Sequence, residues 1–384
     1  MDADTFQMLR DTVRRFVNER LIPAEDRVEE EDEVPAEIVE EMREMGLFGL
    51  SIPEEFGGLG LTMSEEIRIM FELGRTASAF RSVFGTNVGI GSQGILIDGT
   101  EEQKAHWLPK LASGEISSSF ALTEPEAGSD AGSVRTTAIK DGDNYRLNGT
   151  KRYITNAPRA GIFTVMARTD PDTPGAKGVS AFIVPADTPG LTVGKVDKKM
   201  GQKGTKTCDV MFDDALVPAA NIIGGEPGRG FKTAMKVLDR GRINIAASAC
   251  GMADRLVEES VTYAAQRKQF GQEIGTFQLV QGMIADSRTE AYAAWCMARD
   301  IARRFDEGER AAGDVAATKY FATEALGRIA DRAVQVHGGA GYMREYKVER
   351  FYRDVRLLRI YEGTSQIQQT IIAKTLLREA GLKV

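Results

Sequence analysis

The chain has 384 residues, a formal net charge of −7 and a sequence pI near 5.3. That length exceeds one ordinary hydrophobic core, so two or three domains are expected, and the acidic balance excludes a nucleic-acid-binding or anionic-membrane surface. Three cysteines and two histidines, far apart in the sequence, provide no spacing for a disulfide framework or for a metal site.

The first part of the chain carries helical patterns. Apolar residues between Phe6 and Val17 recur at the spacing of one helix face, and the segment 35–46 begins with proline and ends with glycine, as a helix does. Ser64 is expected to cap the next helix, and Thr100 begins a capping-box pattern with the glutamine three residues later. We therefore predict an α-helical N-terminal domain over residues 1–115.

The pattern changes to strands over residues 116–228. The segments SSSFALT, NYRLNGT, IFTVMAR, VSAFIV, LTVGKV and CDVMFDDALV are rich in β-branched and aromatic residues, and turn clusters such as DGDN and ADTPG separate them. No helical stretch long enough for a crossover lies between these strands. They predict an antiparallel β-sandwich or β-barrel as the middle domain.

The helical period returns over residues 229–384, after the glycine-rich link GGEPGRG. Long segments over about 231–269, 277–305 and 313–337, and a shorter one after Ser365, predict a C-terminal four-helix bundle. No apolar stretch approaches the length of a membrane span, and the polar N-terminus is not a signal peptide sequence. We therefore expect a soluble, cytoplasmic protein without membrane contacts, or a protein of the mitochondrial matrix if this is a processed form.

Two segments match nucleotide-binding motifs only in part. Residues 89–94 have the spacing G-x-G-x-x-G, but no strand precedes them and Asp98 with the following glycine breaks the chain soon afterwards. The segment GEPGRGFKT lacks the residue spacing of a phosphate-binding loop. A dinucleotide or P-loop site is therefore not expected at either place.

Three segments carry a resemblance to a known family. ALTEPEAGSDAGSVRT, the run LDRGRINIAAS followed by QRKQFGQ, and RIYEGTSQIQ resemble the signature regions of acyl-CoA dehydrogenases of the short- and medium-chain type. The helix–strand–helix order and the length also match, so the resemblance covers essentially the whole chain. It implies FAD-dependent α,β-dehydrogenation of an acyl-CoA thioester to the trans-2-enoyl-CoA.

The resemblance implies that FAD lies along the middle domain and is also contacted by a neighbouring subunit. Arg267 is implied at the pyrophosphate, a role that suits its rigid donor fork. Many members have tryptophan where this chain has Tyr153. Because the implied site uses two subunits, a homotetramer built as a dimer of dimers is expected. The implied FAD contacts are Phe120, Leu122, Thr123, Gly128, Ser129, Tyr153, Ile154, Thr155, Arg267, Gln269, Phe270, Phe277, Gln278, Gln335, Gly338, Gly339, Thr364 and Gln366.

Glu362 is implied as the catalytic base that takes the α-proton, while the β-hydride passes to N5 of the flavin. Burial in an apolar cleft would make this carboxylate more basic, and fixed donors such as its backbone N–H would stabilise the enolate oxygen. Some members carry the base at the position of Gly241, which has no side chain here. Glu362 is therefore the candidate that remains.

The implied contacts to the acyl-CoA are Ser129, Asp239, Arg242, Tyr361 and Gly363, with Arg81 as a further candidate. Asp239 and Arg242 are three residues apart on a predicted helix. An ordinary ion pair on that helix is therefore the alternative interpretation of these two residues.

One segment bears on the identity of the acyl group. AFRSVFG resembles the YRS segment of glutaryl-CoA dehydrogenases, where an arginine binds the distal carboxylate of the substrate. Arg81 takes that place, but Gly74 stands where those enzymes have an acidic residue. Ser92 and Gln93 are expected to line the acyl tunnel. Our main expectation is a short or branched acyl chain.

Two other functions are weighed against this expectation. One is a dehydrogenase or a non-oxidative, desulfinase-like enzyme that acts on an anionic acyl-CoA such as glutaryl-CoA. The other is a non-catalytic helical adaptor, which would be expected to have lost the flavin motifs or the base, and this chain has both. The expected electron acceptor is an electron-transferring flavoprotein.

Overall fold

The computed structural model describes residues 1–173 and 175–383. The N-terminal part is helical, as predicted, and one predicted helix start is wrong. Ser64 was expected to cap the next helix, but the cap is Thr62 and the helix begins at Met63, because the hydroxyl of Thr62 accepts from the N–H of Glu65 and the Glu65 carboxylate accepts from the N–H of Thr62 in return. The helices are α1 Ala3–Phe16, α2 Ile22–Glu31, α3 Ala36–Glu44, α4 Met63–Gly74, α5 Ser78–Thr86, α6 Gln93–Asp98 and α7 Glu101–Ala112.

The predicted capping box at Thr100 is confirmed. Its hydroxyl accepts from the N–H of Gln103, and the Gln103 side chain accepts from the N–H of Thr100. The same glutamine amide donates to the carbonyls of Ala220 and Ile222, at 2.7 Å each. One side chain therefore starts α7 and also joins that helix to the middle part of the chain.

The middle part forms a seven-stranded sheet in the order β1-β4-β2-β3-β7-β6, with β5 paired to β4. Most pairs are antiparallel, as predicted, but β1 runs parallel to β4, and β2 has one parallel pairing with β4, which the strand pattern did not predict. The β2–β3 hairpin itself supplies the long connection that parallel neighbours need. The strands are β1 Ser117–Ala121, β2 Thr137–Asp141, β3 Asn144–Thr155, β4 Ala160–Arg168, β5 Val179–Pro185, β6 Leu191–Val193 and β7 Thr207–Pro218.

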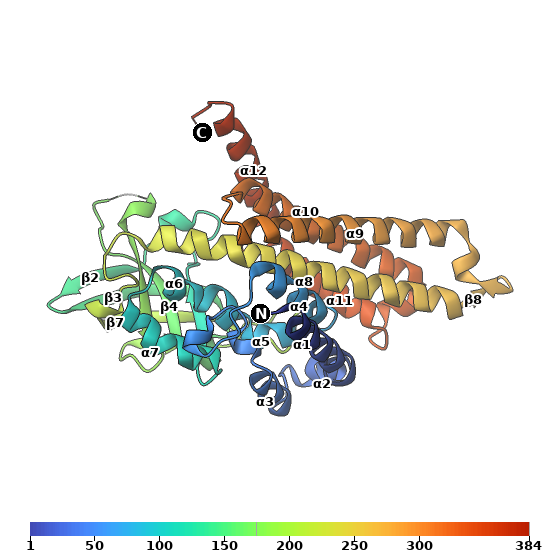
Figure 1. Ribbon diagram of the computed structural model, residues 1–384, viewed down its shortest axis with the longest axis horizontal. Helices are drawn as coiled ribbons and strands as arrows, with labels where there is room; N and C mark the ends of the chain where they lie inside the picture. The colour runs from blue at the N-terminus through green and yellow to red at the C-terminus, as the bar shows by residue number, and fades with distance from the viewer. Residues whose placement is uncertain (174, 384) are drawn as a thin grey trace.

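The C-terminal part is built on long helices that lie side by side (Figure 1). The short helix α11 was not predicted. Among the described residues, none of the helices has both the length and the apolarity needed to cross a membrane. The helices are α8 Gly230–Gln266, α9 Gln278–Asp306, α10 Ala312–His337, α11 Lys347–Val355 and α12 Ser365–Glu379.

Helix α8 is the element that touches all parts of the molecule. It has 37 residues, which makes it about 55 Å long at the usual rise per residue. Glycines allow close approach along it: a Cβ on Gly230 would meet the backbone of β5, and a Cβ on Gly251 would lie 2.1 Å from the carbonyl oxygen of Phe71 in α4. The sheet and the N-terminal helices are therefore packed on one continuous helix.

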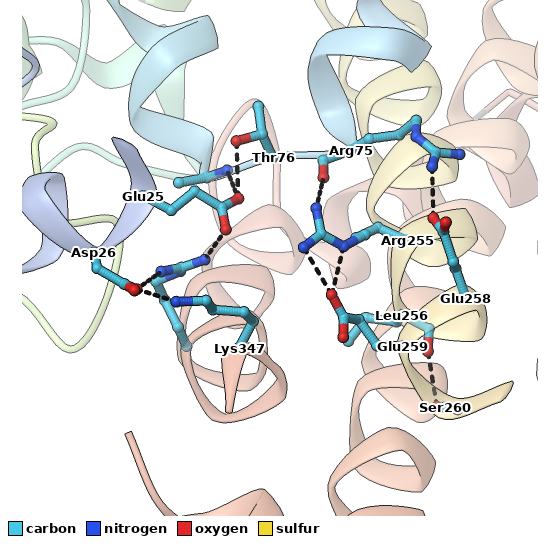
Figure 2. Close-up of polar contacts among 12 residues, drawn as sticks. Glu25, Asp26, Arg75, Thr76, Arg255, Leu256, Glu258, Glu259, Ser260 and Lys347 are labelled. Carbon is cyan, nitrogen blue, oxygen red and sulfur yellow. Dashed lines mark hydrogen bonds and ion pairs between the residues drawn. The ribbon is translucent and has the colours of Figure 1, made fainter. Parts of the chain in front are cut away.

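The turn between α4 and α5 is held from two sides (Figure 2). On one side, the buried carboxylate of Glu25 accepts from the Thr76 hydroxyl at 2.8 Å and pairs with Arg350 of α11. On the other side, Arg255 of α8 donates to the carbonyl of Arg75 at 3.2 Å. The start of α5 is thus fixed by α2, α8 and α11.

Candidate active site

One cavity of about 910 Å³ lies where α4, α5 and α8 meet the sheet and the loop before α12. Leu73 and Arg81 line it from the N-terminal part, Tyr153 from the sheet, and Gly241 and Glu362 from the C-terminal part. Residues that are far apart in the sequence therefore line one continuous cavity.

Glu362 enters this cavity from a strained loop. Its φ is +52°, and that of the following Gly363 is +88°. A left-handed conformation costs a non-glycine residue about 1–3 kcal/mol and persists only where the surroundings enforce it. The loop ends at once in α12, whose first turn is capped by the Thr364 hydroxyl. The loop therefore aims the Glu362 side chain at the cavity and away from the helix.

The Glu362 carboxyl has the character of a base. Burial raises its pKa, while the positive charges of Arg81, Lys319 and Arg242 oppose that rise. Its Oε2 atom is buried and has no hydrogen-bond partner among the described residues. A carboxylate with a raised pKa and a free oxygen can accept a proton from a bound molecule.

Gly241 and Arg242 face this carboxylate from α8. A Cβ on Gly241 would lie 2.3 Å from the Oε2 atom of Glu362, so the two positions considered for a base abut each other. Arg242 lies 3.4 Å from the Glu362 carbonyl through its Nε and pairs with Asp239 at 2.6 Å. The predicted ion pair is therefore present, and Arg242 but not Asp239 lines the cavity.

Eight of the predicted flavin contacts line the same cavity. They lie at the end of β1, in the loop after it and at the end of β3. A buried pair supports that loop: Lys151 donates to the Glu124 carboxylate at 2.7 Å, and Glu124 accepts from the backbone N–H of Thr136 at 2.9 Å. The eight are Phe120, Leu122, Thr123, Gly128, Ser129, Tyr153, Ile154 and Thr155.

This wall fits a flavin ring. It combines apolar side chains with the hydroxyls of Thr123 and Thr155, and a Cβ on Gly128 would meet nothing within 4 Å, so the backbone there faces open space. A flavin needs hydrogen-bonding groups at its ring edge and an apolar enclosure. Tyr153 is 58% exposed at the rim, with the Arg152 guanidinium 4.8 Å from its ring centre.

The other predicted cofactor contacts lie elsewhere. The hairpin of β8 Lys268–Gln269 and β9 Gln272–Glu273 stands at the end of the long helices opposite the sheet (Figure 1). Phe270, at its tip, is 93% exposed. Thr364 and Gln366 are at the start of α12 and do not line the cavity either. The predicted residues outside the cavity are Arg267, Gln269, Phe270, Phe277, Gln278, Gln335, Gly338, Gly339, Thr364, Gln366 and Asp239.

Of the expected substrate contacts, Ser129, Arg81, Arg242, Tyr361 and Gly363 line the cavity. The Nε atom of Arg81 is buried without a hydrogen-bond partner, and no ion pair within the described part of the chain engages its guanidinium. Burial raises the pKa of Tyr361 to about 12, so its hydroxyl stays neutral.

The expectation for Ser92 and Gln93 is wrong, because neither lines the cavity. The irregular segment Asn87–Gly91 turns Gln93 inward, where its amide donates to the Ser51 hydroxyl at 2.9 Å and to the Val88 carbonyl at 3.2 Å. The amide is satisfied within the protein and makes no contribution to the cavity wall.

Three polar residues that were not predicted line the cavity instead. Ser78, Asn244 and Ser248 each leave one buried side-chain oxygen without a hydrogen-bond partner. Their spacing held a usable signal, because Asn244 and Ser248 follow Gly241 at helical intervals of three and seven residues. Ser78 precedes Arg81 by one turn of α5 in the same way.

Three family models match the chain in order. They are the acyl-CoA dehydrogenase N-terminal domain over residues 3–115, the middle domain over residues 119–215 and the C-terminal domain over residues 228–377. An acyl-CoA dehydrogenase of Bacillus subtilis is 44% identical, with 96% of this chain and 97% of the relative covered. The caffeyl-CoA reductase–Etf complex subunit CarC of Acetobacterium woodii is 40% identical, with 97% and 98% covered.

Solved structures agree over the same extent. Butyryl-CoA dehydrogenase from Megasphaera elsdenii has a TM-score of 0.94 and 36% identity, covering 98% of this chain and 100% of its own. Glutaryl-coenzyme A dehydrogenase in complex with glutaryl-CoA has a TM-score of 0.93 and 37% identity, covering 98% and 97%. The chain therefore belongs to the acyl-CoA dehydrogenase family of FAD-dependent oxidoreductases, which act on CH–CH donors.

Proposed function

We propose that this protein dehydrogenates a short or branched acyl-CoA between its α and β carbons, with Glu362 as the base that removes the α-proton. The observation that carries the proposal is the Glu362 carboxyl itself. It stands in the cavity on a strained loop, its pKa is raised by burial, and its Oε2 atom lacks a hydrogen-bond partner. No other carboxylate among the described cavity-lining residues adjoins Gly241.

The chain supplies the proton transfer and the binding. FAD, when bound, supplies the acceptor for the β-hydride. Glu362 accepts the α-proton, and its backbone N–H, which donates to no carbonyl in the described loop, is available to a thioester oxygen that gains negative charge. Apolar residues of α4 and α8, such as Leu73 and Met252, exclude water around the acyl chain.

A second candidate substrate is an acyl-CoA with an anionic or polar tail. Arg81 forms no ion pair with a described residue, and Ser78, Asn244 and Ser248 bring unsatisfied oxygens to the same cavity. A substrate carboxylate would give this partly buried guanidinium a hydrogen-bonded ion-pair partner. Overall similarity does not choose between the two candidates, because the butyryl-CoA and glutaryl-CoA enzymes match the chain equally well.

We propose that the protein acts as a homotetramer and passes its electrons to an electron-transferring flavoprotein. The predicted cofactor contacts near Phe270 are exposed and remote from the chain's own cavity, which suits a contribution to a neighbouring subunit. The relative from Acetobacterium woodii belongs to an Etf complex, which supports this class of electron acceptor.

The test is anaerobic bleaching of the flavin in the purified protein by butyryl-, isobutyryl-, octanoyl-, glutaryl- and succinyl-CoA. We expect one of the first two to bleach it fastest. Glu362→Gln should keep its FAD and bleach more slowly by a factor of about 10²–10⁴, the usual contribution of a general base. Bleaching by Glu362→Gln at the unaltered rate would place the base elsewhere.

The second candidate has its own outcome in the same assay. If the tail is anionic, glutaryl-CoA should bleach the flavin fastest, and Arg81→Ala should slow that reaction by about 100-fold, the cost of removing one partner of a buried charge pair. An equal loss with butyryl-CoA would mean that Arg81 does not read the tail.

A further inference from the structure

A buried lysine lies directly beneath the loop that carries Glu362. Lys319 belongs to α10, and its side chain is 0% exposed. Its Nζ donates to the carbonyl of Tyr361 at 3.2 Å and to the carbonyl of Gly363 at 2.9 Å. The ammonium group thus bridges the residues on either side of Glu362. No sequence motif pointed to this lysine.

Other donors complete the hold on this loop. Gln368, also buried, donates to the carbonyls of Glu362 at 3.1 Å and Gly363 at 3.0 Å. Arg242 approaches the Glu362 carbonyl from α8. All three carbonyls from Tyr361 to Gly363 therefore point at buried donors, and among these described donors Lys319 alone reaches both flanking carbonyls. Glu362, a non-glycine residue with a positive φ, needs this kind of enforcement.

Lys319 also contributes charge. The charged groups that act on Glu362 are Arg81 from α5, Arg242 from α8 and Lys319 from α10. Arg242 has a carboxylate partner in Asp239, whereas the hydrogen bonds of Lys319 go to carbonyls alone. Burial lowers the pKa of Lys319 to about 8, and the Glu362 carboxylate opposes that change. At neutral pH the lysine is therefore still cationic.

A second residue of α10 holds the end of the loop. Glu324 accepts from the Ser365 hydroxyl at 2.6 Å and from the Arg359 guanidinium at 2.8 Å. Its negative charge also supports the cationic form of Lys319. Helix α10 thus presents a donor to the centre of the loop and an acceptor to its end, so the loop has one defined register on the helix.

We propose that Lys319 is a positioning residue for the catalytic base: its ammonium group holds the Tyr361–Gly363 backbone in the conformation that directs Glu362 into the cavity, and it supplies positive charge beneath the carboxylate. This inference rests on Glu362 being the base. Lys319 itself contacts neither the substrate nor the cofactor wall, since it does not line the cavity.

The test compares Lys319→Met, which removes donor and charge, with Lys319→Gln, which retains N–H donors, and Lys319→Arg, which retains the charge. FAD content and the rate of flavin reduction by the fastest acyl-CoA of the panel are measured across pH. With full FAD, Lys319→Met should reduce about 10- to 100-fold more slowly, as expected for a base displaced from its position. Its activity should also need a pH higher by about one unit, because a lost cation raises the pKa of Glu362.

At high pH, Lys319→Gln should be faster than Lys319→Met. The acid limb of its pH profile, where the rate falls as Glu362 is protonated, should still lie at higher pH than in the unaltered protein. In Lys319→Arg the acid limb should be that of the unaltered protein. Amide exchange of the segment 356–368 should be faster in Lys319→Met, while α9 is unchanged. An unaltered rate and acid limb in Lys319→Met would overturn the proposal. If that variant does not retain FAD, unaltered acid limbs in both Gln and Arg variants would overturn it.

The failure of the proposed function looks different. Glu362→Gln would then reduce its flavin at the unaltered rate, whatever the Lys319 variants do. Loss in Glu362→Gln together with normal behaviour of every Lys319 variant would leave the base in place and reject only the role of the lysine.

Discussion

The two ends of α8 differ in whether the residues predicted to form the active site lie together in one cavity. At the sheet end, one cavity is lined by the Glu362 loop, by α5 and by the eight predicted flavin contacts of the middle part. Buried donors on three helices hold the loop. At the far end, the hairpin after Arg267 carries residues that were predicted to contact the cofactor, but it stands exposed, with Phe270 almost fully open to solvent. The motifs predicted cofactor contacts at both ends, but the predicted residues at the far end do not line the cavity.

Apart from removal of the base itself, the largest effect expected at the sheet end comes from one added methyl group. Gly241→Ala would place a Cβ against the Glu362 carboxylate, which must then move. A displacement of about 1 Å at a reacting group commonly costs about 10²-fold in rate. We therefore expect flavin reduction in Gly241→Ala to be slower by that factor, with FAD content unchanged, in rapid-mixing absorbance measurements.

Gly282→Ala is the matched control for this change. Gly282 also lies within a long helix, and a Cβ there would meet nothing within 4 Å. Its reduction rate should equal that of the unaltered protein. A Gly241→Ala protein as fast as this control would mean that the carboxylate is not confined where the structure has it.

At the far end, Arg267→Ala should weaken FAD binding by about tenfold, through the loss of one charged contact. If the hairpin serves a neighbour's cavity, chains with Arg267→Ala and chains with Glu362→Gln should complement each other when refolded together. A mixed pair keeps one intact combination, so at an FAD concentration too low to load the Arg267→Ala sites about one quarter of the sites should be active. Flavin reduction per chain measures this directly.

Glu362→Gln mixed with Gly241→Ala provides the control, because both changes damage the same end and no intact combination forms. Complementation by this second mixture would reveal an assay artefact. No complementation by the first mixture would mean that each chain completes its own cofactor site.

The smallest effect concerns the pH dependence at the sheet end. Because burial raises the pKa of Glu362, the rate of flavin reduction should fall as pH drops through a value above the ordinary glutamate range. Arg81 opposes that rise, so Arg81→Ala should move the acid limb to higher pH, by about one unit. A shift to lower pH would contradict the placement of this charge.

Local patterns predicted the elements that rest on local rules. The order of helices, strands and helices follows from periodicity, and the capping box at Thr100 follows from hydroxyl and amide spacing. The parallel pairing of β1 with β4 could not be predicted, because the sequence of a strand does not specify its neighbour in the sheet. Parallel neighbours are joined by long connections and are therefore far apart in the sequence. Ser64 was the wrong cap because Thr62 offered the same chemistry two residues earlier.

The site divides in the same way. The family resemblance identified the flavin wall and Glu362 as candidates, and the structure gathers them in one cavity. Lys319 had no signal, since its role depends on a loop 42 residues later in the chain folding onto α10. Gln93 was misplaced because the irregular turn before it rotates the side chain inward.

Because α8 is one unbroken helix, it fixes the distance and the relative rotation between the cavity and the hairpin. Arg267 follows Gly241 by 26 positions, and this separation corresponds to about 39 Å along the helix axis. Inserting a single residue between them would rotate the hairpin by about 100° and shift it by about 1.5 Å. Unlike the surface loops, this stretch therefore cannot gain or lose residues without uncoupling the two ends of the molecule.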